Sequence, residues 1–514
     1  MDILVSAIIG DLASRSASFV IGKYFRRQPG VNEILQRLQR VVPRIDTVVE
    51  EAEGRDITNQ GMLRQLKMLR QEMYKGHYVL DALKSQAALD EEEVSHSSTA
   101  AVLSESSASP AKRLRFSGGG GGGGGGRGNR GAAAMLMFGA NKTIREELQR
   151  VVEALEDTMD AGMREFVSFL ALYPRVLRQP YCAYLLLENC MFGRQTEREQ
   201  VLNFLLCPST SATPSLPVLP IVGPLRVGKS TLVEHVCRDE SVRDHFSRIL
   251  FFSEGSLEDE GVIIDPRGSN CFQVRHQKCV SRCHERLLLV VEVAENINDG
   301  TWTRLKSSVS RMAACGGSKI IVTSRSDMIV DLGTTEAVRL HGLPPDAHWY
   351  FFKSLAFGSA HPDENPGMVR MAMEIASDQR RCLMRAQVVA GLLRDNFDAR
   401  LWRAVLECVR AYRKMHPSLC SREDEPPAPY HWRLGRSCKN FFIYKHHQSG
   451  SSEEVPKISV QDIVLGRGGR LPRGEFQALA LRSSIPPYYN YMVTCTVPEP
   501  QPTVGRKKPA ILNK

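Results

Sequence analysis

One eight-residue segment near the middle of the chain limits the possible folds more than any other feature. Residues 223–230 read GPLRVGKS and fit the pattern G-x-x-x-x-G-K-[ST] without a mismatch. An apolar run at residues 218–222 precedes them, and the helix-like sequence LVEHVC follows. A strand, a glycine-rich loop and a helix in this order form a loop whose backbone N–H groups surround an anion. The matching context on both sides makes a fortuitous glycine-rich turn the weaker interpretation.

The residue types in this segment predict a phosphate site. Gly223 and Gly228 allow the backbone to curl, and Lys229 would place its charge between the β- and γ-phosphates of a nucleotide. The hydroxyl of Ser230 would bind the Mg²⁺ that bridges the same phosphates, and Thr231 lies next to it. The sequence therefore predicts nucleotide binding by these five residues, with Mg²⁺ held partly by Ser230.

The surrounding sequence predicts an α/β fold. Short apolar, β-branched runs recur along residues 216–360, and segments long enough to hold helices separate them. Strands that alternate with helices form a doubly wound parallel sheet with helices on both faces. Pro220 departs from this pattern, because proline cannot donate a hydrogen bond to a neighbouring strand. The runs expected as strands are residues 217–222, 249–252, 287–291 and 319–323.

A phosphate loop of this kind works with a carboxylate at the end of a second strand, which supports the Mg²⁺. The apolar run 287–291 ends in Glu292, which we expect to be this carboxylate, the alternative being an ordinary strand-end residue. The next position, which often carries a second acid in hydrolytic proteins of this kind, is Val293. Without an acid there to orient water, we expect the chain to be at most a slow ATPase.

Two further groups of residues have weaker support. Arg325 follows the run 319–324 and would lie over the cleft, where it could contact a terminal phosphate; a surface salt bridge is the equal alternative. Several side chains of the types that bind zinc occur close together, but they contain no C-x-x-C pair, so free thiols are the preferred interpretation. They are Cys271, His276, Cys279, Cys283 and His284.

Amphipathic helices precede the phosphate loop. Apolar residues recur at spacings of three and four over residues 34–52, 62–83 and 144–170, which puts one apolar stripe on each helix. Pro43 lies inside the first stripe and should kink the helix or mark its true start. Between the second and third stripes, residues 85–135 hold an acidic run, a Ser-rich part and nine consecutive glycines. We therefore expect one helical bundle with a disordered insertion.

The composition of the chain bears on its partners and on its location in the cell. The net charge of +10 is small for 514 residues and favours a mixed-sign surface over a nucleic-acid partner, while peripheral contact with an acidic membrane stays open. The 13 scattered cysteines suit reduced thiols inside a cell. No apolar run approaches the roughly 20 residues of a membrane span, and the N-terminus lacks the basic start of a signal peptide. We expect a cytoplasmic protein, with nuclear import through the basic cluster at residues 112–115 as a further option.

Longer motifs resemble a known family. MFGR at residues 191–194, followed by Glu197 and Glu199, is similar to the segment that introduces the nucleotide-binding module, NB-ARC, of plant disease-resistance proteins with leucine-rich repeats. GSKIIVTSR at residues 317–325 is the most specific match, and residues 340–357 are similar to the helical motif that follows it. The chain resembles the coiled-coil type of this family, in a shortened grass-type form without leucine-rich repeats.

The resemblance implies a function and a set of ligands. Intact members are expected to rest with ADP, exchange it for ATP and oligomerise, and Arg325 would be their phosphate-sensing arginine. The N-terminal bundle would be a coiled-coil signalling domain that binds other proteins, with self-association as a further option, and residues 79–81 would be the remnant of its acidic motif. The preference for adenine rests on the resemblance alone, because the phosphate loop contacts phosphates and not the base.

Several positions depart from the family pattern. His77 and Tyr78 stand where acids are usual ahead of residues 79–81, which leaves the intramolecular contact of that motif an open question. RCLMR at residues 381–385 replaces a Gly-Leu-Pro-Leu turn, and MHP at residues 415–417 does not complete an ADP-sensing Met-His-Asp. We therefore expect a nucleotide pocket that lacks part of the sensing half.

Together these features predict an ADP/ATP-binding and Mg²⁺-binding switch in plant defence. A non-switching adaptor or decoy that acts through its helical bundle is the alternative, and an active P-loop NTPase or kinase is the third hypothesis. The expected segments are the first part of the bundle (1–84), a linker (85–135), the rest of the bundle (136–190), a nucleotide-binding domain (191–360), a degenerate helical region (361–420) and a C-terminal region of unknown function (421–514) with strand character at 441–444 and 489–495.

Overall fold

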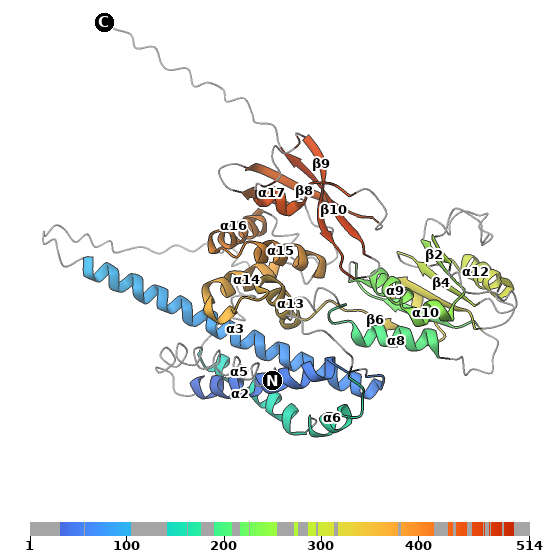
Figure 1. The fold of residues 1–514 in the computed structure, drawn as a ribbon, viewed down its shortest axis with the longest axis horizontal. Coiled ribbons are helices and arrows are strands. Elements are labelled where there is room, and N and C mark those ends of the chain that lie inside the picture. Colours follow the sequence, from blue (N-terminus) through green and yellow to red (C-terminus); the bar gives the residue numbers. More distant parts are fainter. Residues whose placement is uncertain are drawn as a thin grey trace, which may run out of the picture. The chain divides into compact units, whose positions relative to one another are not determined.

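The structure is a computed structural model of the 514-residue chain. The chain divides into two compact units, Met1–Trp402 and Arg403–Lys514 (Figure 1). The described residues are 31–55, 57–103, 141–161, 163–175, 190–207, 216–225, 227–253, 272–275, 286–294, 297–312, 317–378, 382–415, 430–434, 438–449, 455–465, 467, 472, 474–485 and 488–497.

The first unit contains a six-stranded sheet (Figure 1). Its strands are β1 (Val218–Val222), β2 (Arg248–Ser253), β3 (Phe272–Arg275), β4 (Leu287–Glu292), β5 (Lys319–Ser324) and β6 (Val338–Arg339). The spatial order is β3-β2-β4-β5-β1-β6. β3 runs antiparallel to β2, whereas the other neighbouring pairs are parallel. The four apolar runs predicted as strands are β1, β2, β4 and β5, and the parallel sheet confirms the predicted α/β fold.

Helices pack on both faces of this sheet. They are α8 (Gln195–Leu206), α9 (Lys229–Cys237), α10 (Glu240–His245), α12 (Asp299–Met312) and the 3₁₀ helix η2 (Asp327–Leu332). Because alternate residues of a strand point to opposite sides, Leu219 and Ile221 of β1 pack with α8, α9 and α10, whereas Val218 and Val222 pack with α12 and η2. Burial on both faces explains why these strands are continuous apolar runs.

Pro220 fits inside β1 because its missing N–H group faces a position without a partner strand. The carbonyl oxygens of Val218 and Val222 accept hydrogen bonds from the N–H groups of Thr334 and Leu340, both on the β6 side of β1. Pro220 lies two residues from Val218 and two residues from Val222, so its backbone nitrogen faces the same side of β1. β6 pairs with the last two residues of β1, so the absent N–H costs no ladder hydrogen bond.

Four amphipathic helices form the N-terminal part of the first unit. They are α2 (Val31–Glu53), α3 (Gln60–Leu103), α5 (Asn141–Ala161) and α6 (Met163–Leu170). Leu38, Ile45 and Leu155 are fully buried, and α2, α3 and α5 all pack against one another. At Gly76 of α3 an added Cβ would lie 2.6 Å from Val42 Cγ2, which shows how closely α3 approaches α2. The predicted helical bundle is confirmed.

Two sequence expectations about these helices differ from the structure. α2 begins at Val31 and continues through Pro43, so the prediction that Pro43 marks the start of the helix is wrong. Proline removes one hydrogen bond within the helix, and the apolar stripe on both sides of it keeps the two halves packed. The backbone of α3 is helical to Leu103, beyond residue 85, where the linker was expected to begin. The glycine run and the basic cluster 112–115 lie outside the described residues.

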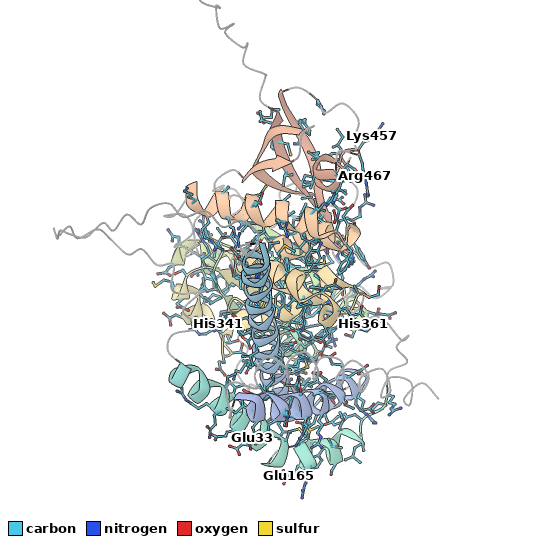
Figure 2. All side chains as sticks on the ribbon, turned by 90° about the vertical axis from the view of Figure 1, so that its left-hand side faces the viewer. Glu33, Glu165, His341, His361, Lys457 and Arg467 are labelled. Atoms are coloured by element: carbon cyan, nitrogen blue, oxygen red, sulfur yellow. The ribbon has the colours of Figure 1, made fainter. Side chains whose placement is uncertain are left out.

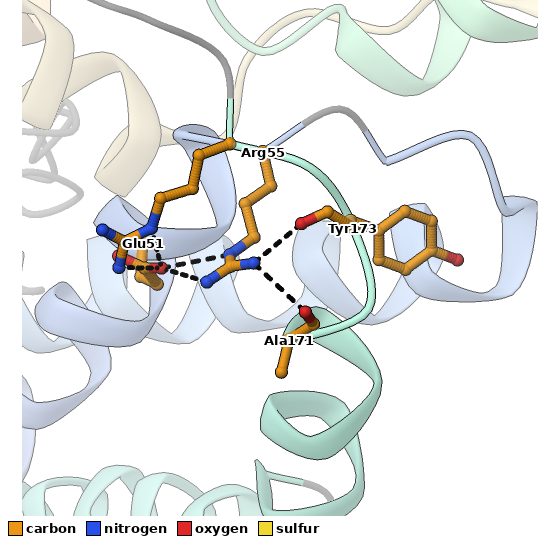
Figure 3. Close-up of polar contacts among 5 residues, drawn as sticks. Glu51, Arg55, Ala171 and Tyr173 are labelled. Atoms are coloured by element: carbon orange, nitrogen blue, oxygen red, sulfur yellow. Dashed lines mark hydrogen bonds and ion pairs between the residues drawn. The ribbon is translucent and has the colours of Figure 1, made fainter.

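An ion-pair cluster joins the end of α2 to the chain that follows α6 (Figure 3). Glu51 Oε1 accepts hydrogen bonds from Arg55 Nη2 at 2.6 Å and from Arg175 Nη2 at 2.8 Å. Arg55 Nη1 also donates to the carbonyl oxygen of Tyr173 at 2.7 Å. Burial alone would raise the pKa of Glu51, but the hydrogen bonds from the two arginines outweigh it and leave that pKa below its ordinary value. The cluster therefore favours a charged carboxylate.

A second group of helices follows β6. They are α13 (Pro345–Phe357), the 3₁₀ helix η3 (Pro362–Glu364), α14 (Pro366–Asp378), α15 (Leu383–Asp395) and α16 (Ala399–Met415). Trp349, Phe351 and Phe352 of α13 are buried and form a helix core. Residues 379–381, which include the first residue of the segment 381–385 expected to replace the family turn, lie outside the described residues, as do residues 416–417.

Asp81 of α3 binds directly to α13. Its Oδ2 atom accepts hydrogen bonds from Trp349 Nε1 at 2.9 Å and from Lys353 Nζ at 2.6 Å, and its side chain is only 6% exposed. His77, one turn earlier, does not disturb this contact, because its Nε2 atom lies 3.0 Å from Asp46 Oδ1 of α2. The acidic remnant at residues 79–81 therefore makes an intramolecular contact, which the sequence had left open.

The second unit contains a small antiparallel sheet. Its elements are β7 (Tyr430–Leu434), β8 (Cys438–Ser449), α17 (Val460–Leu465), β9 (Gly474–Arg482) and β10 (Asn490–Val497). The strand order is β7-β8-β10-β9, with antiparallel pairs throughout. β8 and β10 contain the two segments for which the sequence predicted strand character. Among the described helices, none is both long and apolar enough to cross a membrane.

Candidate phosphate-binding site

The predicted phosphate residues meet at the carboxyl ends of β1, β4 and β5. From β1 the chain passes to β2, returns through β4 to β5 on one side of β1, and later adds β6 on the other side. The strand order therefore reverses at β1, and the loop 223–228 leaves β1 at this point. In open α/β sheets, ligands bind at the carboxyl ends of the strands where the order reverses.

Two glycines shape the loop. Gly228 precedes α9 and has a φ of +98°, which lies in the left-handed region that glycine adopts without a steric cost. At Gly223 an added Cβ would lie 2.6 Å from the carbonyl oxygen of Leu340. The N–H groups of the first turn of α9 follow directly after the loop, and they carry the partial positive charge of a helix N-terminus.

Lys229 is the first residue of α9 and folds back over the loop. Its Nζ atom donates hydrogen bonds to the carbonyl oxygens of Gly223 at 2.7 Å and Pro224 at 3.0 Å. Burial lowers the pKa of Lys229, the charge of Glu292 opposes this change, and the charge of Arg325 adds to it. A buried ammonium held by carbonyl groups would be stabilised further by an anion in the loop.

Ser230 and Glu292 lie in direct contact. The Oγ atom of Ser230 donates a hydrogen bond of 2.7 Å to Glu292 Oε1 at the end of β4. In the neighbouring strand, Thr323 pairs with Glu292, and its Oγ1 atom is buried without a hydrogen-bond partner among the described residues. Hydroxyl and carboxylate oxygens are the ligands that Mg²⁺ prefers. The residues present therefore fit Mg²⁺ bound together with nucleotide phosphates.

Arg325 and Val293 flank this centre. Arg325 is exposed immediately after β5, and its Nε atom donates to the carbonyl oxygen of Ala294 at 3.4 Å. Its charge contributes to lowering the pKa of Lys229. Val293 is buried, and its N–H group donates to the carbonyl oxygen of Thr323 at 3.0 Å. The position that would need a second acid therefore presents a buried apolar side chain.

Thr231, the remaining predicted residue, lies in the first turn of α9 next to Ser230. The zinc candidates at residues 271–284 lie outside the described residues. Within the described part of the chain, no three His, Cys, Asp or Glu side chains are grouped to hold a metal ion. The structure thus brings together Gly223, Gly228, Lys229, Ser230, Thr231 and Glu292, with Arg325 at the margin.

One residue at this site was not predicted from the sequence as a site residue. Arg194, just ahead of α8, donates from Nη2 to the carbonyl oxygen of Val227 in the loop at 3.2 Å and to that of His341 at 2.7 Å; His341 is labelled in Figure 2. Its side chain is buried, and burial lowers its pKa while the charge of Glu197 opposes this. The MFGR motif at residues 191–194 was the available signal, but a motif does not say which loop its arginine contacts.

A parallel sheet that carries this loop, lysine and strand-end carboxylate defines the α/β P-loop NTPase class. Residues 4–113 match the Rx N-terminal domain family. The chain is also similar to disease-resistance proteins of plants. It is therefore a homologue of plant disease-resistance proteins and carries an Rx-type N-terminal domain.

The matched relatives are much longer than this chain. A putative disease resistance protein, RGA4, of Solanum bulbocastanum is 25% identical over 281 residues, which are 51% of this chain and 28% of that protein. A putative disease resistance RPP13-like protein 1 of Arabidopsis thaliana is 24% identical over 421 residues, 79% of this chain and 37% of that protein. Disease resistance protein RGA2 of Solanum bulbocastanum is 26% identical over 43% of this chain and 24% of its own length.

Proposed function

We propose that this chain binds an adenine nucleotide with Mg²⁺ at the phosphate loop and acts as a nucleotide-dependent switch in plant defence. The observation that carries the proposal is the contact between Ser230 and Glu292 beside Lys229, since it brings the start of α9 and the end of β4 together. Its adenine specificity and its role in defence are inferred from the homologous disease-resistance proteins.

In this proposal Lys229 and the N–H groups of the first turn of α9 hold the phosphates, and Ser230 and Glu292 hold the Mg²⁺. Mg²⁺ supplies charge neutralisation between the phosphates when bound. Arg325 contacts the terminal phosphate. Because Val293 cannot orient a water molecule, the proposed protein binds nucleotide and hydrolyses it slowly or not at all.

The N-terminal helices would serve as the interaction part of this switch. An Rx-type N-terminal domain suggests contact with other proteins, and Asp81 links this part to α13 in the unit that holds the phosphate loop. We propose that the bundle binds other proteins inside the cell in a manner that depends on the bound nucleotide.

The proposal is tested on the purified full chain. Protein is denatured, and the released nucleotide is identified by ion-exchange chromatography; uptake of added ADP and ATP is then measured by calorimetry. We expect ADP or ATP binding that falls at least tenfold in Lys229→Ala, because the buried charge is lost. Lys457→Ala, at an exposed lysine of the second unit (Figure 2), should bind as the wild type does.

The rate of phosphate release distinguishes a nucleotide-binding switch from an active NTPase. We expect steady-state release by the wild type to stay close to that of Lys229→Ala. Release far above this background would support an active NTPase. A wild-type chain that holds no nucleotide and takes up neither ADP nor ATP would contradict the switch and support the adaptor that acts through its helical bundle.

A further inference from the structure

A short segment ahead of α8 connects the phosphate loop with the N-terminal helices. It comprises residues 190–197, and we refer to it as the bridging segment. Phe192, Arg194 and Glu197 in it are all buried. Gly193 between them has a φ of +70°, and an added Cβ would lie 2.7 Å from Leu343 Cδ2. The bridging segment is therefore held in one conformation between its neighbours.

On one side, the bridging segment contacts the phosphate loop through a hydrogen bond from Arg194. The Val227 carbonyl that accepts its hydrogen bond belongs to the same planar peptide unit as the N–H group of Gly228. In a trans peptide these two groups point in opposite directions. Because Arg194 is also anchored on the carbonyl oxygen of His341, it fixes the direction of the Val227 carbonyl and with it that of the Gly228 N–H.

This geometry matters for an anion. A carbonyl oxygen that turned into the loop would repel a phosphate, whereas the Gly228 N–H group turned inward would donate to it. Gly228 has a φ of +98°, and because it has no side chain it can also adopt other φ values, which would turn the preceding peptide over. A glycine peptide therefore needs an outside contact to keep one orientation.

On the other side, α3 holds the bridging segment through two contacts. The ring of Phe192 lies 5.5 Å from that of Tyr74 of α3 and 4.9 Å from that of Phe351 of α13. Glu197 Oε1 accepts a hydrogen bond of 3.0 Å from Lys67 Nζ of α3. The side chain of Glu197 is 10% exposed and that of Lys67 is 44% exposed, so the buried carboxylate depends on this lysine.

We propose that Arg194 is a positioning residue that orients the Val227–Gly228 peptide for phosphate, and that α3 sets the phosphate affinity by holding the bridging segment. This inference rests on the proposed nucleotide binding and adds its regulation. When α3 contacts the bridging segment, Arg194 is held against the Val227 carbonyl and phosphate binds more tightly. By linkage, bound phosphate in turn stabilises the seating of α3 by the same factor.

The role of Arg194 is tested with inorganic pyrophosphate, a probe without a base, by calorimetry on the full chain. Arg194→Met keeps the length of the side chain and removes its donors, and we expect Kd to rise about tenfold. Arg194→Lys keeps one donor and should bind within about threefold of the wild type. Arg198→Met is the matched control one turn along α8, because Arg198 pairs with Glu199 and Asp239 and not with the loop.

If Arg194 only stabilised the fold, its substitution would lower the melting temperature of the free protein and leave the Kd of folded variants unchanged. If Arg194 orients the loop for phosphate, the Kd for pyrophosphate rises in correctly folded variants. Pyrophosphate binding by Arg194→Met equal to that of the wild type would overturn the inference. If Arg194→Met does not fold, Arg194→Lys carries the test: a rise in Kd of more than about threefold would overturn the inference, because a lysine can still donate to the Val227 carbonyl.

The role of α3 is tested at a distance from the loop. Lys67→Glu places a second carboxylate against Glu197, and we expect Kd for pyrophosphate to rise roughly threefold to tenfold. The exchanged pair Lys67→Glu/Glu197→Lys should restore most of the affinity. Lys75→Glu is the control, because Lys75 pairs with Glu72 of the same helix.

The outcomes separate this inference from the proposed function. If the wild type binds neither pyrophosphate nor nucleotide, both the proposed function and this inference are contradicted. If the wild type binds and Lys229→Ala does not, while Lys67→Glu and Arg194→Met both bind like the wild type, the inference alone fails. Weaker binding in Lys67→Glu that the exchanged pair restores would support it.

Discussion

The two glycines of the phosphate loop are required for different physical reasons. Gly228 has open space around an added Cβ but a φ of +98°, which costs an L-residue about 1–3 kcal/mol. Gly223 has no such φ, yet an added Cβ would meet the backbone oxygen of Leu340 at 2.6 Å. One position is limited by the conformation of the backbone, and the other by the close approach of a neighbouring strand end.

These differences predict the effect of alanine at each glycine. We expect Gly228→Ala and Gly223→Ala each to lower the free energy of unfolding by about 1–3 kcal/mol, as measured by urea denaturation. Gly342→Ala is the control, because an added Cβ there meets nothing within 4 Å and the residue has no positive φ; its change should stay within about 0.5 kcal/mol. Equal effects at all three positions would contradict this explanation.

Among the elements, α3 makes the contacts that join the N-terminal helices to the rest of the first unit. It packs against α2 and α5 on the one hand and against α8, α13 and α14 on the other. Asp81 is a buried polar group of this junction, and it accepts hydrogen bonds from both Trp349 and Lys353. A carboxylate buried in this way is stable only while both donors are present.

This burial predicts a large effect for a single substitution. Asp81→Ala should lower the free energy of unfolding by about 3 kcal/mol, because it leaves the Lys353 charge buried without its partner. The double variant Asp81→Leu/Lys353→Met should lose less, since no buried charge remains. Asp46→Ala is the control at a more exposed carboxylate that pairs with His77, and about 1 kcal/mol or less is expected there. A double variant that loses more than Asp81→Ala would contradict this account.

The whole molecule consists of two compact units, and the residues of the phosphate site all lie in the first. A ligand that binds only folded protein stabilises the unit that holds its site. The second unit has its own antiparallel sheet, with Val493 and Cys495 of β10 buried. Ligand should therefore act on the two units unequally.

This division predicts the thermal behaviour of the full chain. ADP with Mg²⁺ at about 100 times its Kd should stabilise the first unit by about 2.7 kcal/mol and raise its melting temperature, while the transition of the second unit stays in place. Differential scanning calorimetry with and without ligand measures both, and Lys229→Ala should abolish the shift. A single transition that moves as a whole would contradict the independence of the units.

Local pattern was enough to predict a large part of this architecture. β1 is apolar along its whole length, and β4 and β5 are apolar apart from their ends, because both faces of the sheet are covered. The stripes of α2 and α5 follow the period of a helix, and the loop before Lys229 has a pattern that few other structures share. Of the two alternatives given for Pro43, a helix start there was wrong, because the packing of the apolar stripe of α2 outweighs the local cost of the proline.

The sequence by itself thus determined the elements, the phosphate loop and the residue types of the site, since these depend on neighbours a few positions apart. Only the tertiary structure decided which distant groups meet. Ser230 contacts Glu292, 62 residues away, and Lys353 contacts Asp81, 272 residues away. The first contact depends on the order of strands in the sheet, and the second on the docking of α3 against α13. Neither order nor docking is encoded in a local period, because each depends on burying as much apolar area as possible, and as little unpaired charge, over the whole unit.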